Sequence, residues 1–130
     1  MLRSEEERRV RQHLKLAKGF LDSAVLSSGS SEVDVRNALS RSYYAMLHAC
    51  NALVLSCGME PSKSHGGLRT QAQRLLGKPF GRLVTDLYEL RRVADYRADS
   101  TVVLQIVEPK LKLARTNVLW AWAEAQKNLK

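Results

Sequence analysis

Residues 35–57 read VRNALSRSYYAMLHACNALVLSC, a stretch without Gly or Pro that determines the expected fold. Its apolar and small residues recur every three or four positions and cover more than one side of a helix, as in a helix packed between two neighbours. These residues are Val35, Ala38, Leu39, Ala45, Met46, Ala49, Ala52 and Leu53. Ser31, three residues before Asp34, forms a variant capping box at its start, and Gly58 and Pro61 mark its end. The segment predicts the central helix of a helical bundle.

Four further helices are expected around this one, because the same periodicity returns in four other segments. One runs from about Glu5 to Leu26 and is followed by a Ser/Gly linker over residues 27–30. A shorter helix begins near Ser64 and ends at Gly77, and the next has Pro79 in its first turn. The pattern lapses around Asp99 to Val107, and the last helix starts at Glu108-Pro109.

Each of these helices has an apolar side that we expect to face the core. The inward residues are Val10, Leu14, Ala17, Phe20, Leu21, Ala24 and Val25; Leu68, Ala72, Leu75 and Leu76; Leu83, Leu87, Leu90 and Ala94; and Leu111, Ala114, Val118, Ala121, Trp122 and Ala125. No segment has the alternation of a strand. The sequence therefore predicts an all-α fold, an antiparallel up-and-down bundle of four main helices plus a short helix, as one domain over residues 1–130.

The composition limits the classes of protein that fit the chain. Its 130 residues include 21 Lys and Arg against 13 Asp and Glu, a formal net charge of +8. The length matches one domain and argues against an enzyme with separate cofactor and substrate lobes. No apolar run reaches membrane-spanning length, and the N-terminus lacks the apolar centre of a signal peptide. We therefore expect a cytoplasmic protein without a membrane partner.

The two cysteines are expected to be reduced. Cys50 and Cys57 are seven residues apart on one helix, about 10 Å along its axis, whereas a disulfide needs Cα atoms within about 7 Å. They are interpreted as core or near-core thiols. No Cys/His spacing is that of a zinc site, so we expect neither a metal nor a cofactor.

The central helix carries an unusual density of polar side chains between Arg41 and His48. Tyr44 and His48 are four residues apart and share a face of the helix, and Arg41 lies seven residues before His48. One interpretation is structural, with tyrosine hydroxyls reaching the rim of the core and a hydrogen-bonded core histidine. The other is that Arg41, Tyr44 and His48 contribute to binding a nucleotide or RNA.

The end of the helix that begins at Pro79 gathers a guanidinium, a carboxylate and two phenols. The spacing places Tyr88, Arg91 and Asp95 on one face, with Arg92 and Tyr96 beside it. This face is either an exposed Arg91–Asp95 ion pair next to a solvated Arg92, or a site for a phosphate-containing ligand.

A third cluster, Lys63-Ser64-His65 followed by two glycines, precedes the short helix. Backbone N–H groups at a Gly-rich helix start can hold a phosphate oxygen, with Lys63 and His65 adding charge or donors, although the spacing is not that of a P-loop. Residues 61–85 contain five basic residues and no acidic one. This run is either a solvated basic face or a surface for a phosphate-rich partner.

Taken in order, these patterns resemble the HEPN domain superfamily. They are Arg-x-Tyr-Tyr-Ala at Arg41 to Ala45, Ser-His-x-Gly at Ser64 to Gly67 and Leu-Arg-x-x-Ala-Asp-Tyr at Leu90 to Tyr96. The resemblance covers roughly Arg8 to Ala125 and is greatest to small stand-alone prokaryotic members. It implies a single HEPN-like domain, a homodimer, and frequent pairing with a minimal nucleotidyltransferase in a toxin–antitoxin system.

The resemblance also assigns candidate site residues. Many HEPN domains are metal-independent endoribonucleases with an Arg followed after a short spacer by His. Arg91 matches that Arg, but Asp95 occupies the next position on its face. An aspartate remains an anion near neutral pH and does not shuttle a proton as a histidine does. His48 or His65 would then have to replace the missing histidine from another helix.

Tyr96 suggests a different role for the same helix end. In toxins paired with a nucleotidyltransferase, a tyrosine just beyond the motif histidine accepts a nucleotide, and Tyr96 lies close to that place. Two functions therefore stay open. One is a toxin-like protein that acts on RNA, with Arg91, Asp95 and Tyr96 at its centre. The other is a non-catalytic module that binds a nucleotide or a nucleotidyltransferase.

Overall fold

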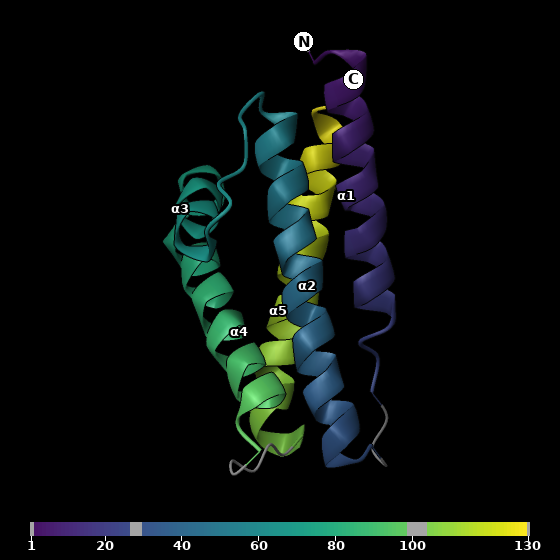
Figure 1. The fold of residues 1–130 in the computed structure, drawn as a ribbon, viewed down its shortest axis with the longest axis vertical. Helices are drawn as coiled ribbons and strands as arrows, with labels where there is room; N and C mark the ends of the chain where they lie inside the picture. The colour runs from purple at the N-terminus through teal and green to yellow at the C-terminus, as the bar shows by residue number, and fades with distance from the viewer. Residues whose placement is uncertain (1, 27–29, 99–103, 130) are drawn as a thin grey trace.

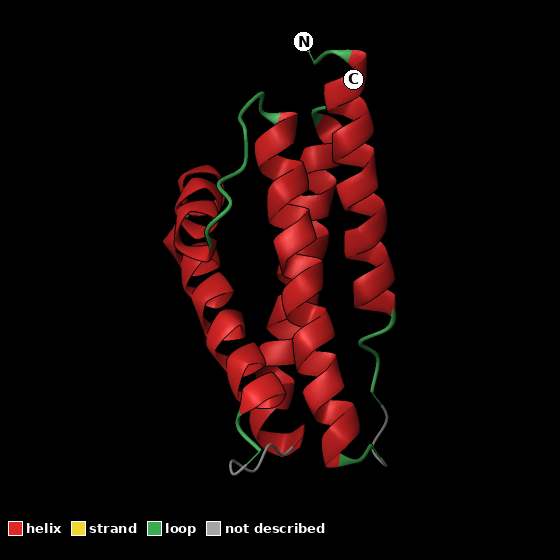
Figure 2. Cartoon of the chain, viewed as in Figure 1, coloured by secondary structure: helices red, strands yellow, loops and turns green. Residues whose placement is uncertain are grey.

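The computed structural model describes residues 2–26, 30–98 and 104–129. The described residues form five α-helices and no strand, which confirms the all-α bundle. The helices are α1 (Ser4–Asp22), α2 (Glu32–Ser56), α3 (His65–Leu76), α4 (Lys78–Tyr96) and α5 (Leu104–Lys127). The four long helices α1, α2, α4 and α5 run alternately up and down, with α2 at the centre, α1 and α5 beside it, and α3 and α4 on its other side (Figures 1 and 2).

The start and end of α2 follow from the residues expected there. The Ser31 hydroxyl accepts a hydrogen bond from the Asp34 amide, and the Asp34 carboxylate accepts one from the Ser31 amide, both at 3.2 Å. This is the expected capping box. At the other end Gly58 has φ of +81°, a left-handed conformation that glycine adopts without strain.

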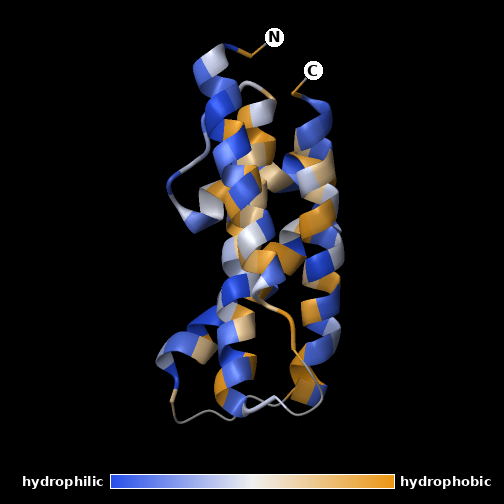
Figure 3. Ribbon diagram, turned by 90° about the vertical axis from the view of Figure 1, so that its right-hand side faces the viewer, coloured by the Kyte–Doolittle hydropathy of each residue, from blue (hydrophilic) through white to orange (hydrophobic). Residues whose placement is uncertain are grey.

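The core lies around α2, as its apolar pattern predicts. Fourteen residues of α2 are buried, and they face α1 and α5 on one side and α3 and α4 on the other. Figure 3 shows hydrophobic and hydrophilic sides alternating along the helices. Phe80, Leu39, Met46 and Leu87 are the largest side chains among those almost fully buried. Because α2 is buried on two sides, it lacks the broad polar face of a helix that packs on one side only.

The end of α1 differs from the prediction. The helix ends at Asp22 rather than near Leu26. The Ser23 hydroxyl donates to the Phe20 carbonyl at 2.9 Å, a local bond that competes with continued helix. Because the helical register is lost there, Val25 is 71% exposed instead of facing the core. The predicted linker at residues 27–29 lies outside the described residues.

The start of α5 also differs from the prediction. The helix includes Leu104 to Val107, so it begins before Glu108, and Pro109 lies inside it. Val107 is buried with Val35, Leu39 and Ala94, and this burial offsets the hydrogen bond that Pro109 cannot donate to the carbonyl four residues before it. Residues 99–103 of the predicted lapse lie outside the described part.

Several individual residues confirm or correct the sequence analysis. Cys50 is buried and reduced, and burial raises the pKa of its thiol to about 12. Cys57 is also reduced but exposed, because it caps the C-terminal end of α2, so its near-core assignment is wrong. Leu75 is 36% exposed in the last turn of α3, a short helix that packs mainly against α2 and α4. Trp122 is half-buried and donates to the Leu14 carbonyl at 3.0 Å.

None of the helices in the described part of the chain is long and apolar enough to span a membrane.

Candidate functional site

Arg91 is enclosed by four tyrosine rings. Tyr43 and Tyr44 come from α2, and Tyr88 and Tyr96 come from α4. The guanidinium carbon lies 5.0 Å from the centre of the Tyr43 ring, 5.9 Å from Tyr44, 5.5 Å from Tyr88 and 5.8 Å from Tyr96. A cation within about 6 Å of an aromatic ring is attracted by the negative charge of the ring face. The four rings therefore hold Arg91 in place without neutralising it.

The nearest carboxylate compensates the charge of Arg91 only in part. Asp95 Oδ2 lies 3.6 Å from Arg91 Nη1, too far for a hydrogen bond, and Asp95 Oδ1 accepts a short hydrogen bond from the Ser40 hydroxyl. The predicted ion pair is thus present but loose. Arg91 Nε is buried and has no acceptor in the part of the chain that the structure describes. Such a donor is unusual, because buried polar groups are normally paired.

Arg91 remains a permanent cation in these surroundings. Burial opposes its charge, but Tyr44, Tyr43, Tyr96 and Asp95 raise the pKa of Arg91 above its usual value. Its side chain is 14% exposed. A guanidinium that is held by rings and has one loose carboxylate partner can donate hydrogen bonds to a phosphate oxygen from its exposed edge.

His65 joins the same cluster from α3. Its ring stacks on Tyr88 at 3.9 Å between centroids and 21° between planes. Its Nδ1 lies 3.2 Å from the Tyr43 hydroxyl. Burial, followed by the charge of Arg69, lowers the pKa of His65 below its usual value, so the imidazole is neutral at pH 7. Burial also raises the pKa of Tyr43, against the effect of Arg91, so its phenol keeps its proton.

The start of α3 places His65 next to an open pocket. The Ser64 hydroxyl accepts from the Gly67 amide at 3.0 Å, which caps the helix immediately before His65. A Cβ atom at Gly67 would collide with the Ser62 side chain, so this turn requires glycine. The pocket is about 440 Å³ in volume and is lined by Tyr43, Asn51, His65, Lys63 and Ser64, among others. His65 therefore contacts the rings around Arg91 and also lines a polar pocket.

Arg36 fixes the end of α4, where Arg91 lies. Its Nη1 donates to the carbonyls of Val93 and Ala94 at 3.1 and 3.0 Å, and its Nη2 donates to the carbonyl of Arg97 at 3.2 Å. The last carbonyls of a helix lack intrahelical partners and carry partial negative charge, so a guanidinium stabilises them. Arg36 thus ties the C-terminal end of α4 to α2.

Two of the predicted site residues belong to other surroundings. His48 faces α1, where its Nδ1 lies 2.9 Å from His13 Nδ1 and its ring stacks on Phe20 at 5.7 Å. Burial lowers the pKa values of both His48 and His13. Arg41 donates to the carbonyl of Ser23 at 3.2 Å, at the end of α1. Tyr44 lies between the two regions, because it contacts Phe20 as well as Arg91.

The remaining predicted residues lie at the surface around Arg91 and His65. Tyr96 is 72% exposed, and its hydroxyl lies 3.5 Å from Arg91 Nη1. Arg92 is exposed, with its guanidinium 5.8 Å from the centre of the Tyr88 ring. Lys63 and Ser64 are exposed at the start of α3. Ser40 and Tyr43 were not among the predicted site residues, and their contacts with Asp95 and Arg91 cross from α2 to α4, which local spacing does not reveal.

The described side chains include no group of three or more His, Cys, Asp or Glu residues that could hold a metal ion. The cluster around Arg91 itself offers a fixed cation, a neutral imidazole, a protonated phenol and a carboxylate.

No protein-family model matches the chain. It is 30% identical over 115 residues to UPF0332 protein PH1297 of Pyrococcus horikoshii. The aligned residues cover 88% of this chain and 80% of that protein. It is also 36% identical over 69 residues to a protein of Methanocaldococcus jannaschii named Putative toxin MJ0605. The aligned residues cover 49% of this chain and 52% of that protein. The first similarity extends over most of both chains, and the second over about half.

Proposed function

The chain belongs to the UPF0332 family, and on this premise we propose that it is a toxin-type protein that binds RNA through the cluster around Arg91. The toxin class is supported by the protein of that name to which half of this chain is similar. The order of the motifs around Arg41, Ser64 and Arg91 supports a place in the HEPN superfamily.

The observation that carries the proposal is the state of Arg91. This guanidinium is held by four tyrosine rings, has a carboxylate only at 3.6 Å and keeps its positive charge. RNA offers both groups that fit such a site, because its phosphate pairs with a guanidinium and its unstacked bases stack on aromatic rings. Tyr96, 72% exposed, supplies an open ring beside the cation. The net charge of +8 favours approach of the polyanion.

His65 is the group that would move a proton if the protein cleaves RNA. As the 2′-oxygen attacks the neighbouring phosphorus, the P–O5′ bond breaks. The proton of the 2′-hydroxyl passes to the neutral imidazole, and the departing 5′-oxygen takes a proton from water. Arg91 would stabilise the charge on the phosphoryl oxygens. Asp95 is not assigned this step, because its Oδ1 accepts a hydrogen bond from Ser40 and its Oδ2 lies 3.6 Å from Arg91 Nη1.

The protein is proposed to act as a homodimer, as the HEPN resemblance implies. Two copies of the C-terminal end of α4 would then form one basic site, with a neutral His65 in each copy. RNA binding by the dimer and the monomer, separated by size-exclusion chromatography with light scattering, tests this part.

The main test measures binding and cleavage of labelled single-stranded RNA by the purified protein in the presence of EDTA. Arg91→Ala is expected to weaken binding roughly tenfold, the usual effect of losing a hydrogen bond to a charged group. The matched control is Arg82→Ala, which removes an exposed arginine from the same helix. Equal affinity of Arg91→Ala and the wild type would contradict the proposal. His65→Phe should bind RNA but not cleave it.

A second candidate function rests on the exposure of Tyr96. This tyrosine is accessible at the end of α4 and lies beside Arg91, so a partner nucleotidyltransferase could add a nucleotide to its hydroxyl. The added phosphate would bring negative charge to Arg91 and Arg92 and block RNA. Intact-mass measurement after coexpression with a neighbouring nucleotidyltransferase is expected to show one added nucleotide, absent from Tyr96→Phe. A mass that does not change, or one that persists in Tyr96→Phe, would contradict this function.

A further inference from the structure

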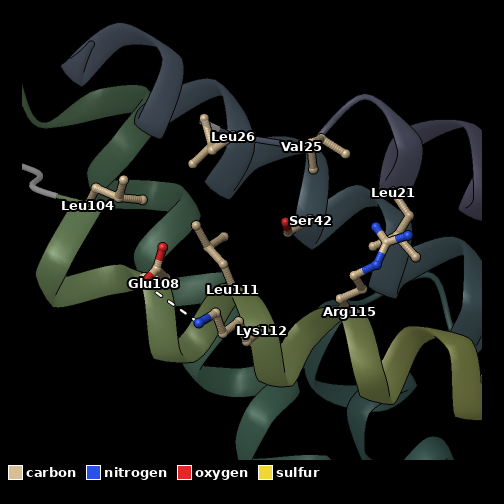
Figure 4. Close-up of a pocket in the computed structure, with 10 residues that line it drawn as sticks. Leu21, Val25, Leu26, Ser42, Leu104, Glu108, Leu111, Lys112 and Arg115 are labelled. Atoms are coloured by element: carbon tan, nitrogen blue, oxygen red, sulfur yellow. Dashed lines mark ion pairs between the residues drawn. The ribbon is translucent and has the colours of Figure 1, made fainter. Parts of the chain in front are cut away.

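A second pocket lies away from Arg91, between the end of α1, the middle of α2 and the first half of α5 (Figure 4). Its volume is about 400 Å³, within the usual range for small-molecule sites. Most of its wall is aliphatic, from Leu21, Ala24, Val25, Leu26, Leu104 and Leu111. No aromatic side chain is among the residues that line it. The wall therefore suits a saturated hydrocarbon chain rather than a nucleobase.

The polar groups of the pocket are few and come from two helices. Ser42 lies on α2 and is only 3% exposed. Figure 4 shows it between Leu111 of α5 and Val25 of the segment after α1. Its hydroxyl makes no hydrogen bond to another residue within the described ranges, so it is free to bond a ligand.

The charges at the pocket leave one cation uncompensated. Lys112 lies 3.8 Å from Glu108 and is paired with it. Arg115 reaches from α5 toward Leu21 (Figure 4) and has no ion pair or hydrogen bond with the side chains that the structure describes. A ligand of matching chemistry therefore carries a single negative charge on an aliphatic body.

We propose that this pocket binds a monocarboxylate with a medium-length saturated chain, such as a fatty acid. The carboxylate pairs with Arg115, whose planar guanidinium matches its two oxygens. The chain lies against the leucine-rich wall. This inference is independent of the proposed RNA site, because none of the residues that line the pocket surrounds Arg91.

The test is isothermal titration of the full chain with sodium decanoate, compared with decanol and decyltrimethylammonium. Decanoate is expected to bind about tenfold more tightly than decanol, because the charged hydrogen bond is lost in the alcohol. The cationic analogue should not bind. Shortening the chain by one CH₂ should weaken binding about fourfold. Decanol binding as tightly as decanoate, or no binding of decanoate, would overturn the proposal.

Three variants locate the binding. Arg115→Gln should weaken decanoate binding about tenfold, whereas Arg74→Gln, the same change at an exposed arginine of α3, should leave it unchanged. Ala24→Phe lies beyond the end of α1, so it should fold, and its ring should fill the pocket and abolish binding. Equal losses in Arg115→Gln and Arg74→Gln would indicate unspecific charge attraction and overturn the proposal. Unchanged binding in Ala24→Phe would do the same.

Discussion

Two clusters of histidine and aromatic rings lie on different sides of α2, and they differ in what surrounds the imidazole. His65 stacks on Tyr88, contacts the Tyr43 hydroxyl and lines an open pocket, with Arg91 among the same rings. His48 instead faces His13 and Phe20. Two adjacent residues of α2 contact different clusters, because Tyr43 contacts His65 and Tyr44 contacts Phe20. A cation and an open pocket, rather than the histidine itself, therefore mark the candidate site.

The largest expected effect separates the two tyrosines. Tyr43 is 4% exposed, and Tyr43→Ala removes a buried ring that contacts both His65 and Arg91. It should lower the free energy of unfolding by roughly 3 kcal/mol, as for other large aromatic truncations. Tyr44 is only half-buried, so Tyr44→Ala should lower it by less. Chemical denaturation measures both. A greater loss of free energy of unfolding for Tyr44→Ala than for Tyr43→Ala would contradict the assignment of Tyr43 as the buried ring.

The next effect distinguishes the clusters by pH. Burial lowers the pKa values of His13 and His48 below the ordinary value of 6.5, so the unfolded chain binds more protons than the folded chain at mildly acidic pH. The contribution of these two neutral imidazoles to the free energy of unfolding is complete above pH 6.5. It is lost as the pH falls from 6.5 through their folded pKa values. Between pH 7 and pH 5 we therefore expect the free energy of unfolding to decrease, as chemical denaturation at a series of pH values would measure.

The control for this pH effect is the double variant His13→Gln/His48→Gln. Because it lacks the two imidazoles that meet between α1 and α2, its free energy of unfolding should fall less steeply over the same pH range. His65 also has a lowered pKa and should account for part of the remaining slope. An identical slope in the double variant would show that the His13–His48 pair does not cause the effect.

A smaller effect tests whether His65 transfers a proton or only packs against the neighbouring rings. In His65→Phe the ring can still stack on Tyr88, but the hydrogen bond with Tyr43 is lost. The expected loss in the free energy of unfolding is about 1 kcal/mol. RNA cleavage by the wild type should decrease as the pH falls through the lowered pKa of His65, because only the neutral imidazole accepts a proton. Full cleavage of RNA by His65→Phe would contradict proton transfer by His65 and show that this residue only packs against its neighbours.

The smallest effect concerns Ser40. Ser40→Ala removes the hydroxyl that donates to Asp95, at an expected cost of about 0.5 kcal/mol at this exposed position. Asp95 then has one partner fewer and can approach Arg91, so RNA binding should weaken slightly. Fluorescence anisotropy with labelled RNA measures this. Stronger binding by Ser40→Ala would mean that Asp95 does not compete for Arg91.

The sequence predicted the helices far better than the contacts between them. Periodicity identified the core side of α2, and the Ser31–Asp34 pair located its start, because both signals lie within a few residues. Pro109 misled the prediction of α5, since the burial of Val107 against Ala94 depends on the packed structure. The same applies to the candidate site, where Arg91 and Asp95 share a helix face but His65 joins them only through the packing of α3 against α4.

The bonds from Arg36 to the last carbonyls of α4 make the candidate site depend on a residue outside the ring cluster. They anchor the end of α4, which carries Arg91, to a neighbouring helix. A substitution of Arg36 should therefore loosen this helix end and shift Arg91 relative to Tyr43, although Arg36 is not one of the aromatic residues around that guanidinium.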